Sequence, residues 1–388
     1  MAITTGSIPR SPTSRLNRNP AAAWRHLDLV LLGAVVAIAA LGVLMVYSAT
    51  RGPAAPYNTT FFHKQALFVA IGVVILALAS LIDYRVFRDY ALFGYIGVVG
   101  LLVLVISPFG HSSKGAQAWF QLGTFQLEPA EFVKLAVILM LAGIASQLHN
   151  EVDLRRLGLL LFLVGLPFGL IMLQPDLGTG LVLVAIALGV LVVAGVRGKH
   201  LLVLLIIGIV GTTVVLQSSL LKDYQVARLT SFVSQDVSNG NPEQAKAVYN
   251  VNQSKIAIGN GGALGQGLFA GPQTRLSNVP EQHTDFIFTA VGEQLGFIGA
   301  ATLLAMFCIV AWRVWRIAQL ARDPFGTLVC VGVLCLFMFQ IFENVGMTMG
   351  IMPVTGIPLP FMSYGGSATI AEFAAMGIVL NIHMRRFS

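Results

Sequence analysis

Apolar runs of about twenty residues follow one another along almost the whole of this sequence. A helix needs about 20 apolar residues to cross a bilayer, and 56% of the 388 residues are hydrophobic whereas 11% are charged. This balance excludes an ordinary soluble domain and predicts an all-α polytopic membrane protein with about ten transmembrane helices. The expected helices are 27–49, 65–82, 89–109, 129–147, 156–174, 177–196, 200–218, 286–312, 325–349 and 364–383.

Lysine and arginine residues are distributed unevenly between the two sides of these helices. With the N-terminus inside, the short outer loops hold only Arg51, Lys64 and Lys114, and the inner segments hold most of the others. Both termini are therefore expected in the cytoplasm, with a large extracytoplasmic loop, 219–284, between helices 7 and 8. The net charge of +7 then reflects topology and does not indicate a nucleic-acid partner.

The N-terminal segment, residues 1–26, is rich in Arg, Ser and Pro and has no apolar centre. It is not a signal peptide, and we expect a disordered cytoplasmic tail followed by one transmembrane domain, 27–388. The three cysteines all lie in apolar runs, which indicates neither a disulfide framework nor a zinc site.

The segment 280–296 joins a polar, acidic half to the start of the eighth apolar run. If that run is helical, Asp285, Thr289 and Glu293 lie on one face of the helix. An ionisable group beside hydrocarbon favours a functional role. Thr284 or Asp285 at the N-cap position is the structural alternative, and the spacing alone leaves both interpretations open.

Charges are few inside the apolar runs, and two of them form an obvious pair. Glu131 and Lys134 are three residues apart, so they share a face of the fourth helix. The pair is either a structural clasp that neutralises both charges or part of an aqueous cavity that opens to the outer face.

The long outer loop contains two features of its own. Residues 245–258 predict a short helix that ends at Gly259. The glycine-rich run 259–267 that follows is either a flexible turn or a cradle whose backbone N–H groups bind a phosphate.

Five segments, in this order, resemble the SEDS family (shape, elongation, division and sporulation) of polytopic peptidoglycan glycosyltransferases. The resemblance covers nearly everything after the tail, and the form of 353–360 is similar to the elongation-type (RodA-like) rather than the division-type (FtsW-like) members. The segments are Lys-Gly-Ala-Gln-Ala-Trp at 114–119, Glu-Pro-Ala-Glu-Phe-Val-Lys at 128–134, Gln-Pro-Asp-Leu-Gly-Thr at 174–179, 283–296 with His-Thr-Asp-Phe-Ile-Phe, and Pro-Leu-Pro-Phe-Met-Ser-Tyr-Gly-Gly-Ser at 358–367.

The resemblance implies that the chain polymerises lipid II into glycan strands on the outer face of the bacterial cytoplasmic membrane during cell elongation. It implies an inverting transfer with Asp285 as the general base, and cations that stabilise the leaving pyrophosphate. The sequence shows no cluster of metal ligands. A divalent cation such as Mg²⁺ or Mn²⁺ is nevertheless an alternative source of positive charge. The other expected substrate-binding or cavity residues are Glu131, Lys134, Asp176, Lys255, Arg275, Glu293 and Trp119.

Two departures from the family pattern concern this expected site. The family usually has Arg where this chain has Ala118, and Gln and Ser where it has Glu128 and Ala130. The missing cation at 118 argues against pyrophosphate binding at that position, whereas Glu131 and Lys134 of the motif are intact.

The resemblance also implies a partner, a class B penicillin-binding protein that supplies the transpeptidase. Its membrane helix is expected to dock on small residues of the eighth and ninth helices. Two other functions stay open: a flippase or transporter of lipid II, and a non-catalytic scaffold for the transpeptidase. The docking residues are Gly296, Gly299, Ala300, Ala301, Gly326 and Gly332.

Overall fold

The computed structural model describes residues 26–386, except 114–115, 124, 149–152 and 218–241. The predicted tail therefore lies almost entirely outside the described residues, as does Lys114. Ten long helices correspond one to one with the ten predicted runs. They are α2 (Leu29–Thr50), α3 (Thr60–Leu81), α5 (Ala91–Ile106), α6 (Pro129–Ala145), α7 (Leu154–Leu173), α8 (Leu177–Val193), α9 (Gly198–Gln217), α13 (Ile287–Leu320), α14 (Pro324–Met349) and α15 (Gly366–Met384).

Local sequence explains where many of these helices begin. The Asp28, Asp153, Asp176 and Asp323 side chains each accept a backbone N–H at the first turn of α2, α7, α8 and α14, respectively. Proline opens α6 and α14, where its missing N–H costs nothing. By length and apolar composition, α2, α3, α7, α13, α14 and α15 are each able to cross a membrane.

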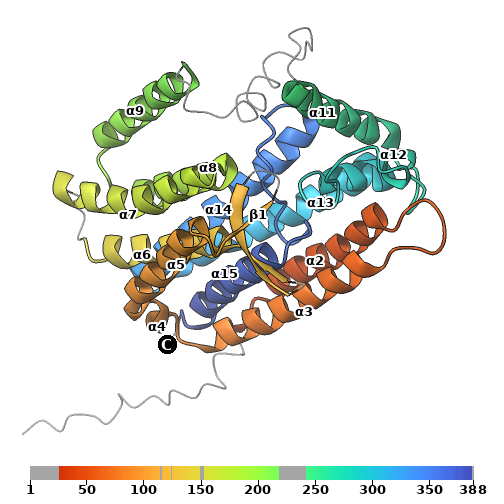
Figure 1. Ribbon diagram of the computed structural model, residues 1–388. Helices are drawn as coiled ribbons and strands as arrows, with labels where there is room; N and C mark the ends of the chain where they lie inside the picture. The colour runs from red at the N-terminus through yellow and green to blue at the C-terminus, as the bar shows by residue number, and fades with distance from the viewer. Residues whose placement is uncertain (1–25, 114–115, 124, 149–152, 218–241, 387–388) are drawn as a thin grey trace, which may run out of the picture.

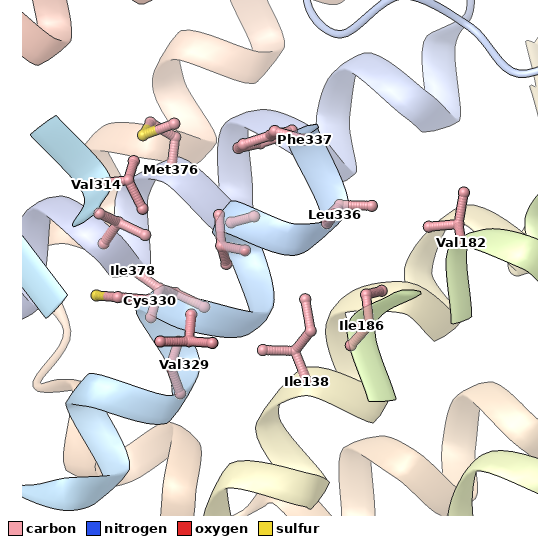
Figure 2. Packing of buried hydrophobic residues seen from close by; sticks show 14 of the residues in the cluster. Ile138, Val182, Ile186, Val314, Val329, Cys330, Leu336, Phe337, Met376 and Ile378 are labelled. Atoms are coloured by element: carbon pink, nitrogen blue, oxygen red, sulfur yellow. The ribbon is translucent and has the colours of Figure 1, made fainter. Parts of the chain in front are cut away.

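The bundle has a core made mainly by α6, α8, α13, α14 and α15 (Figure 1). In Figure 2, Ile138 of α6 lies between Ile186 of α8 and Val329 of α14. Gly332 of α14 brings its backbone against Ile138, since a Cβ atom there would lie 2.7 Å from the isoleucine Cγ2. By contrast, α9 lies at the edge of the bundle, and most of its described apolar side chains are exposed.

A small antiparallel sheet, which the sequence analysis did not predict, follows α5. It consists of β1 (His111–Ser113), β2 (Ala116–Leu122) and β3 (Phe125–Leu127) in the order β1-β2-β3. The Trp119 ring and the chain leading into α6 are positioned by this sheet, because β3 ends directly before Glu128.

Three further helices complete the described elements: the short helices α4 (Tyr84–Asp89) and α12 (Pro272–Arg275), and the longer, more polar α11 (Pro242–Gly261). The helix predicted for 245–258 is α11, which is longer at both ends, and Val248 and Val251 are buried as expected.

The helix α13 is broken at Gly296 (φ 65°, ψ −164°). The glycine-rich run, 259–267, forms backbone hydrogen bonds with α13 on both sides of this break, and we call this arrangement the splice. Before the break, the carbonyls of Glu293 and Gln294 accept the N–H groups of Gln266 (2.9 Å) and Gly267 (3.1 Å). After it, the N–H groups of Phe297 and Ile298 donate to the carbonyls of Gly262 (2.9 Å) and Ala263 (3.1 Å). The run therefore has a structural role. The N–H groups of Gln266 and Gly267 donate to α13, so they are not available to bind a phosphate.

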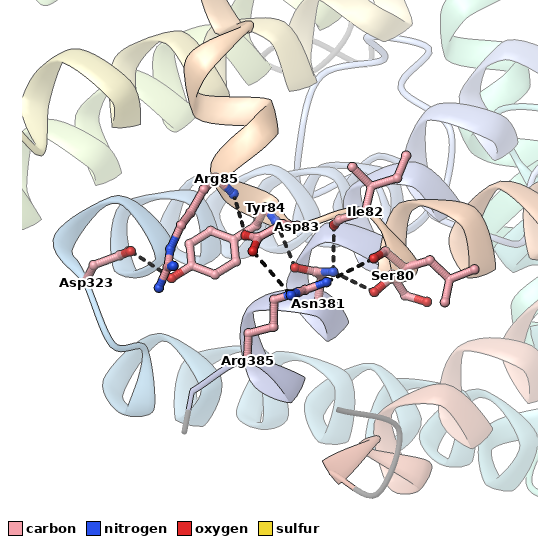
Figure 3. A network of polar contacts seen from close by, with 9 residues as sticks. Ser80, Ile82, Asp83, Tyr84, Arg85, Asp323, Asn381 and Arg385 are labelled. Atoms are coloured by element: carbon pink, nitrogen blue, oxygen red, sulfur yellow. Dashed lines mark hydrogen bonds and ion pairs between the residues drawn. The ribbon is translucent and has the colours of Figure 1, made fainter. Parts of the chain in front are cut away.

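The ends of several helices are joined on one side of the bundle by the polar network in Figure 3. The Asn381 Nδ2 atom of α15 donates to the carbonyls of Ser80 (2.5 Å) and Ile82 (2.7 Å), and its Oδ1 accepts the N–H of Tyr84 (3.0 Å). The Tyr84 hydroxyl donates to Asp323 Oδ2 (2.7 Å). Burial and this hydrogen bond raise the pKa of Tyr84 to about 12.

The start of α2 and the end of α13 meet on the same side, since Arg313 Nε donates to Asp28 Oδ2 (2.7 Å). Both ends of the described bundle thus share the face that carries the excess of arginine, as the cytoplasmic assignment of the termini requires.

Candidate active site

Asp285 lies in a tight turn just before α13. The carbonyl of Glu281 accepts the N–H groups of Thr284 (3.2 Å), Asp285 (3.1 Å) and Phe286 (3.3 Å), and Glu281 itself has φ of +51°. A positive φ is strained for a residue with a side chain, and such strain persists where the surroundings enforce it. Phe286 occupies the N-cap position of α13, so the N-cap alternative for Thr284 or Asp285 is wrong. Asp285 is half-buried.

Residues 351–365, between α14 and α15, are non-helical, and all of them except Ile351 are buried or half-buried; we call them the buried segment. Non-helical backbone near membrane depth is tolerated only when protein surrounds it. Here Gln65 Nε2 of α3 donates to the Ser363 carbonyl (3.2 Å), and the Ser363 hydroxyl accepts the N–H of Leu359 (2.8 Å).

Four of the five segments that carry the family resemblance meet around the buried segment and the start of α15, which together contain the fifth segment, 358–367. The N–H of Tyr364 donates to the carbonyl of His283 (2.9 Å), two residues before Asp285. The N–H of Glu128 donates to the Ser367 hydroxyl (2.9 Å). The 174–179 motif reaches it at Gly178, where a Cβ atom would lie 2.9 Å from Ile357 Cγ1. These segments are distant in sequence, so they form one site only in the folded chain.

Trp119 of β2 brings in the segment 114–119 through Glu128. Its indole Nε1–H donates to Glu128 Oε2 at 2.9 Å. Burial of this carboxyl group, together with the nearby charges of Glu131 and Asp176, raises the pKa of Glu128 to about 8.

Glu131 and Lys134 form the predicted pair, with Lys134 Nζ 2.6 Å from Glu131 Oε2. Two further acids, Glu128 and Glu372, are electrostatic neighbours of Lys134. Lys134 is therefore surrounded by carboxyl groups.

Glu372, which sequence reasoning missed, joins this cluster to the buried segment. Its Oε2 accepts the N–H of Phe361 (2.8 Å), whose φ is +62°. The signal for Glu372 was an acidic residue within the last apolar run, of the same kind as Glu293 in the eighth.

The remaining predicted residues have local structural roles or lie at the surface. The fully buried Glu293 accepts the N–H groups of Gln273 (2.7 Å) and Thr274 (2.9 Å), so it holds α12 onto α13. The side chain of Lys255 lies over Gly350, the C-cap of α14, where a cation favours the helix dipole. Arg275 is exposed at the end of α12.

Asp176 interacts with two parts of the structure. Its Oδ1 atom caps α8 by accepting the N–H of Thr179 (3.0 Å), and its charge acts on Glu128. The structure thus gathers Trp119, Glu131, Lys134 and Asp176 in one cluster, while Glu293, Lys255 and Arg275 lie on α13, α11 and α12, respectively.

An aromatic cluster, also missed from the sequence, packs beside the Asp285 turn. The rings of Phe61, His283 and Tyr364 contact one another, with centroids 4.9, 5.1 and 5.6 Å apart. Within the described part of the chain, no group of three or more His, Cys, Asp or Glu residues is arranged to hold a metal ion.

Comparison with known proteins gives consistent matches along the whole described bundle. Residues 28–387 match the model of the FtsW, RodA and SpoVE family, described as "Cell cycle protein". The chain is 37% identical to the probable peptidoglycan glycosyltransferase FtsW of Trichlorobacter lovleyi over 363 residues, which are 92% of each protein. It is 35% identical to the peptidoglycan glycosyltransferase MrdB of Escherichia coli, covering 93% of this chain and 94% of that protein.

Solved structures give the same picture. The crystal structure of Thermus thermophilus RodA superposes with a TM-score of 0.70 at 28% identity, covering 94% of this chain and 99% of that one. A chain from "Structural coordination of polymerization and crosslinking by a peptidoglycan synthase complex" superposes with a TM-score of 0.78 at 30% identity, covering 93% and 99%.

Proposed function

The chain belongs to the cell cycle protein family of FtsW, RodA and SpoVE, and from this premise we propose that it polymerises lipid II with Asp285 as the general base. It is a peptidoglycan glycosyltransferase and a multi-pass protein of the cytoplasmic membrane. The observation that carries the proposal is the meeting of four distant segments around the fifth, 358–367, and the rest of the buried segment, with an acid on a strained turn beside it.

The proposed reaction is a single displacement with inversion. The carboxylate of Asp285 takes the proton of the acceptor's 4-hydroxyl as that oxygen bonds to the anomeric carbon of the donor, and the bond from that carbon to the undecaprenyl pyrophosphate breaks. Pyrophosphate leaves as an anion, so a cation near it lowers the barrier. Lys134 is neutralised by Glu131 and Lys255 lies at the end of α14, whereas the exposed Arg275 is open to an anion, which favours Arg275 for this role.

We place the lipid part of the substrate along the apolar surface of the bundle beside the site. A small apolar hollow between α13 and α14, lined by Phe307, Val310, Leu334 and Phe337, lies against Phe361 of the buried segment. The hollow is too small for a whole prenyl chain, so most of the chain would lie in the lipid with the sugars near Asp285.

An elongation role rests on sequence alone. The form Pro-Val-Thr-Gly-Ile-Pro-Leu-Pro at 353–360 is similar to elongation-type members, and the curated relatives include both division and sporulation proteins. Complementation of strains that lack either the elongation or the division protein tests this assignment directly.

A transpeptidase partner is part of the proposal. Support comes from the similarity to a chain of a peptidoglycan synthase complex that couples polymerisation and crosslinking. The chain's own described residues make a helical bundle with one small sheet, so crosslinking of peptides is assigned to the partner.

The test is polymerisation of purified lipid II by the purified protein in nanodiscs. Asp285→Asn should lower the rate by about 100-fold or more, since a general base contributes about 10²–10⁴. Glu281→Gln, in the same turn but exposed, is the matched control and should retain activity. Polymer made at the normal rate by folded Asp285→Asn overturns the base assignment. Transport of lipid II without polymer supports the flippase alternative. The absence of both polymerisation and transport supports the scaffold alternative.

A further inference from the structure

The outer half of α14 buries an unusual number of polar side chains. Gln340, Glu343, Asn344 and Thr348 are all fully buried. Burying an amide or carboxyl group costs free energy unless the group forms hydrogen bonds. We therefore looked for the hydrogen-bond partners of these side chains. Two of them, Glu343 and Asn344, bind the chain that packs against α14.

Asn344 uses both N–H groups of its amide at once. Its Nδ2 atom donates to the Asp285 carbonyl and to the Ile357 carbonyl, at 2.8 Å each. The orientation of the amide follows from these contacts, because the opposite one would place its oxygen against two carbonyl oxygens. The side chain thus joins three parts of the chain: α14, the Asp285 turn and the buried segment.

The other hydrogen bonds described for the Asp285 turn do not reach the carbonyl of Asp285. Glu281 accepts N–H groups from within the same turn, and Tyr364 donates to the carbonyl of His283. Among the hydrogen bonds described for this turn, the one from Asn344 reaches the main chain of Asp285 itself from another element.

The buried segment has a second tether to α14 that does not involve Asp285. The Thr355 hydroxyl donates to Glu343 Oε1 at 2.9 Å. This bond joins the same helix to the same segment as the bond from Asn344 to Ile357, so Thr355 provides a control for effects on the segment alone.

We propose that Asn344 is a positioning residue that fixes the main chain of Asp285 against the buried segment and so sets where its carboxylate meets the acceptor hydroxyl. This inference rests on the proposed role of Asp285 as the base. A misplacement of about 1 Å in a catalytic group costs about 100-fold in rate. Asn344 therefore affects turnover and leaves substrate affinity nearly unchanged.

The kinetic test compares Asn344→Leu, which keeps the size of the side chain and removes both donors, with Thr355→Val. Polymerisation of lipid II by the full chain in nanodiscs gives kcat and KM for each. Asn344→Leu should lower kcat by about 100-fold with KM within about threefold of the parent, while Thr355→Val keeps kcat near the parent value. A kcat for Asn344→Leu equal to that of Thr355→Val overturns the inference. Asn344→Asp, of the same shape, replaces Asn344→Leu if the latter does not fold.

Hydrogen exchange separates this inference from the proposed function. The amides of Thr284, Asp285 and Phe286 should exchange faster in Asn344→Leu, and at the parental rate in Thr355→Val and Asp285→Asn. If Asp285→Asn still polymerises, the base assignment fails, but the exchange rates still decide whether Asn344 holds the turn. Parental exchange in the folded Asn344→Leu and Asn344→Asp variants contradicts the positioning role even if Asp285 is the base.

Discussion

Lys134 Nζ lies 2.6 Å from Glu131 Oε2, and the two side chains are 4% and 6% exposed, respectively. An ion pair this deeply buried adds little stability by itself, but removal of one partner leaves an uncompensated charge. In this protein the ion-pair partner of Lys134 is Glu131, with Glu128 and Glu372 as further electrostatic neighbours, so the loss of the lysine leaves the Glu131 charge uncompensated.

The first prediction follows from this asymmetry. Lys134→Met alone should cost about 3–5 kcal/mol of stability and lower the folded yield, whereas the double variant Glu131→Gln/Lys134→Met should recover most of it. Thermal unfolding in nanodiscs measures the stability, and polymerisation measures the activity. A double variant that is stable and active makes the pair a structural clasp; one that is stable and inactive places the pair at the substrate.

The second prediction concerns Glu128 and pH. Because burial raises the pKa of Glu128 to about 8 from its ordinary value of 4.5, the folded chain holds a proton that the unfolded chain releases between these values. Stability from this group is therefore full below about pH 4.5 and is lost as the pH rises through about 8.

Glu128→Gln, which restores the residue usual in the family, removes this titration. Its amide oxygen can still accept the Trp119 N–H. The difference in melting temperature between Glu128→Gln and the parent should be small at pH 5 and clearly in favour of the variant at pH 9. A difference that is constant from pH 5 to pH 9 contradicts the raised pKa.

The third prediction concerns the splice in α13. Gly296→Ala should prevent normal folding, because its positive φ strains any other residue and a Cβ atom would overlap the N atom of Gly265. Gly259→Ala is the matched control within the same glycine-rich run, since no atom lies within 4 Å of its Cβ position. It lies in α11 and should be neutral or slightly stabilising. Equal folded yields for the two variants would show that the splice is dispensable.

The fourth prediction concerns the transpeptidase partner. Among the six small residues expected to form its docking face, Gly296, Gly326 and Gly332 pack against this chain's own atoms, and Gly299 has no room for a side chain beside Leu295. Ala301 is exposed, so Ala301→Leu is the cleaner probe.

Ala301→Leu should reduce co-purification of the partner and its stimulation of polymerisation, with basal polymerisation retained. Gly97→Leu serves as the control, because Gly97 is exposed on α5 with no atom within 4 Å of its Cβ position. Undiminished co-purification with Ala301→Leu refutes docking at this face of α13.

The fifth prediction tests the polar network of Figure 3 around Asn381 and Tyr84. Tyr84→Phe leaves Asp323 without the hydroxyl donor at 2.7 Å and should cost about 2 kcal/mol, because the acceptor is charged. The control is Tyr90→Phe, which should not change the stability, because the Tyr90 ring is exposed at the C-terminal end of the same short helix, α4. Similar unfolding curves for the two variants would refute a stabilising role for the Tyr84 hydroxyl.

The ten helices were predictable because each rests on a local property, a run of apolar residues between polar turns. Glu131 and Lys134 were predictable for the same reason, since their spacing alone puts them on one face. The sheet at 111–127 was not, because its strands are short and its pattern of polar and apolar residues is weak.

The connections within the site were beyond sequence reasoning. Asn344, Gln65 and Asn381 each bind backbone carbonyls of segments elsewhere in the chain, and no local pattern names such partners. The glycine-rich run shows the same limit, because its hydrogen-bond partners lie about 30 residues further along the chain in α13. Its composition fits a phosphate cradle as well as it fits a splice.

The buried segment has a consequence for how this gene can recombine with its relatives. Its backbone lies against Gly42 of α2, where a Cβ atom would lie 2.7 Å from Met362 Cα, and against Gly178 of α8. It is also bonded to α3, α14 and α15. A chimera that receives only residues 351–365 from a relative would combine that loop with five unmatched neighbours. Viable crossover points are therefore expected in lipid-facing helices such as α5 and α9, and sequence changes in this loop should be inherited together with changes in the helices around it.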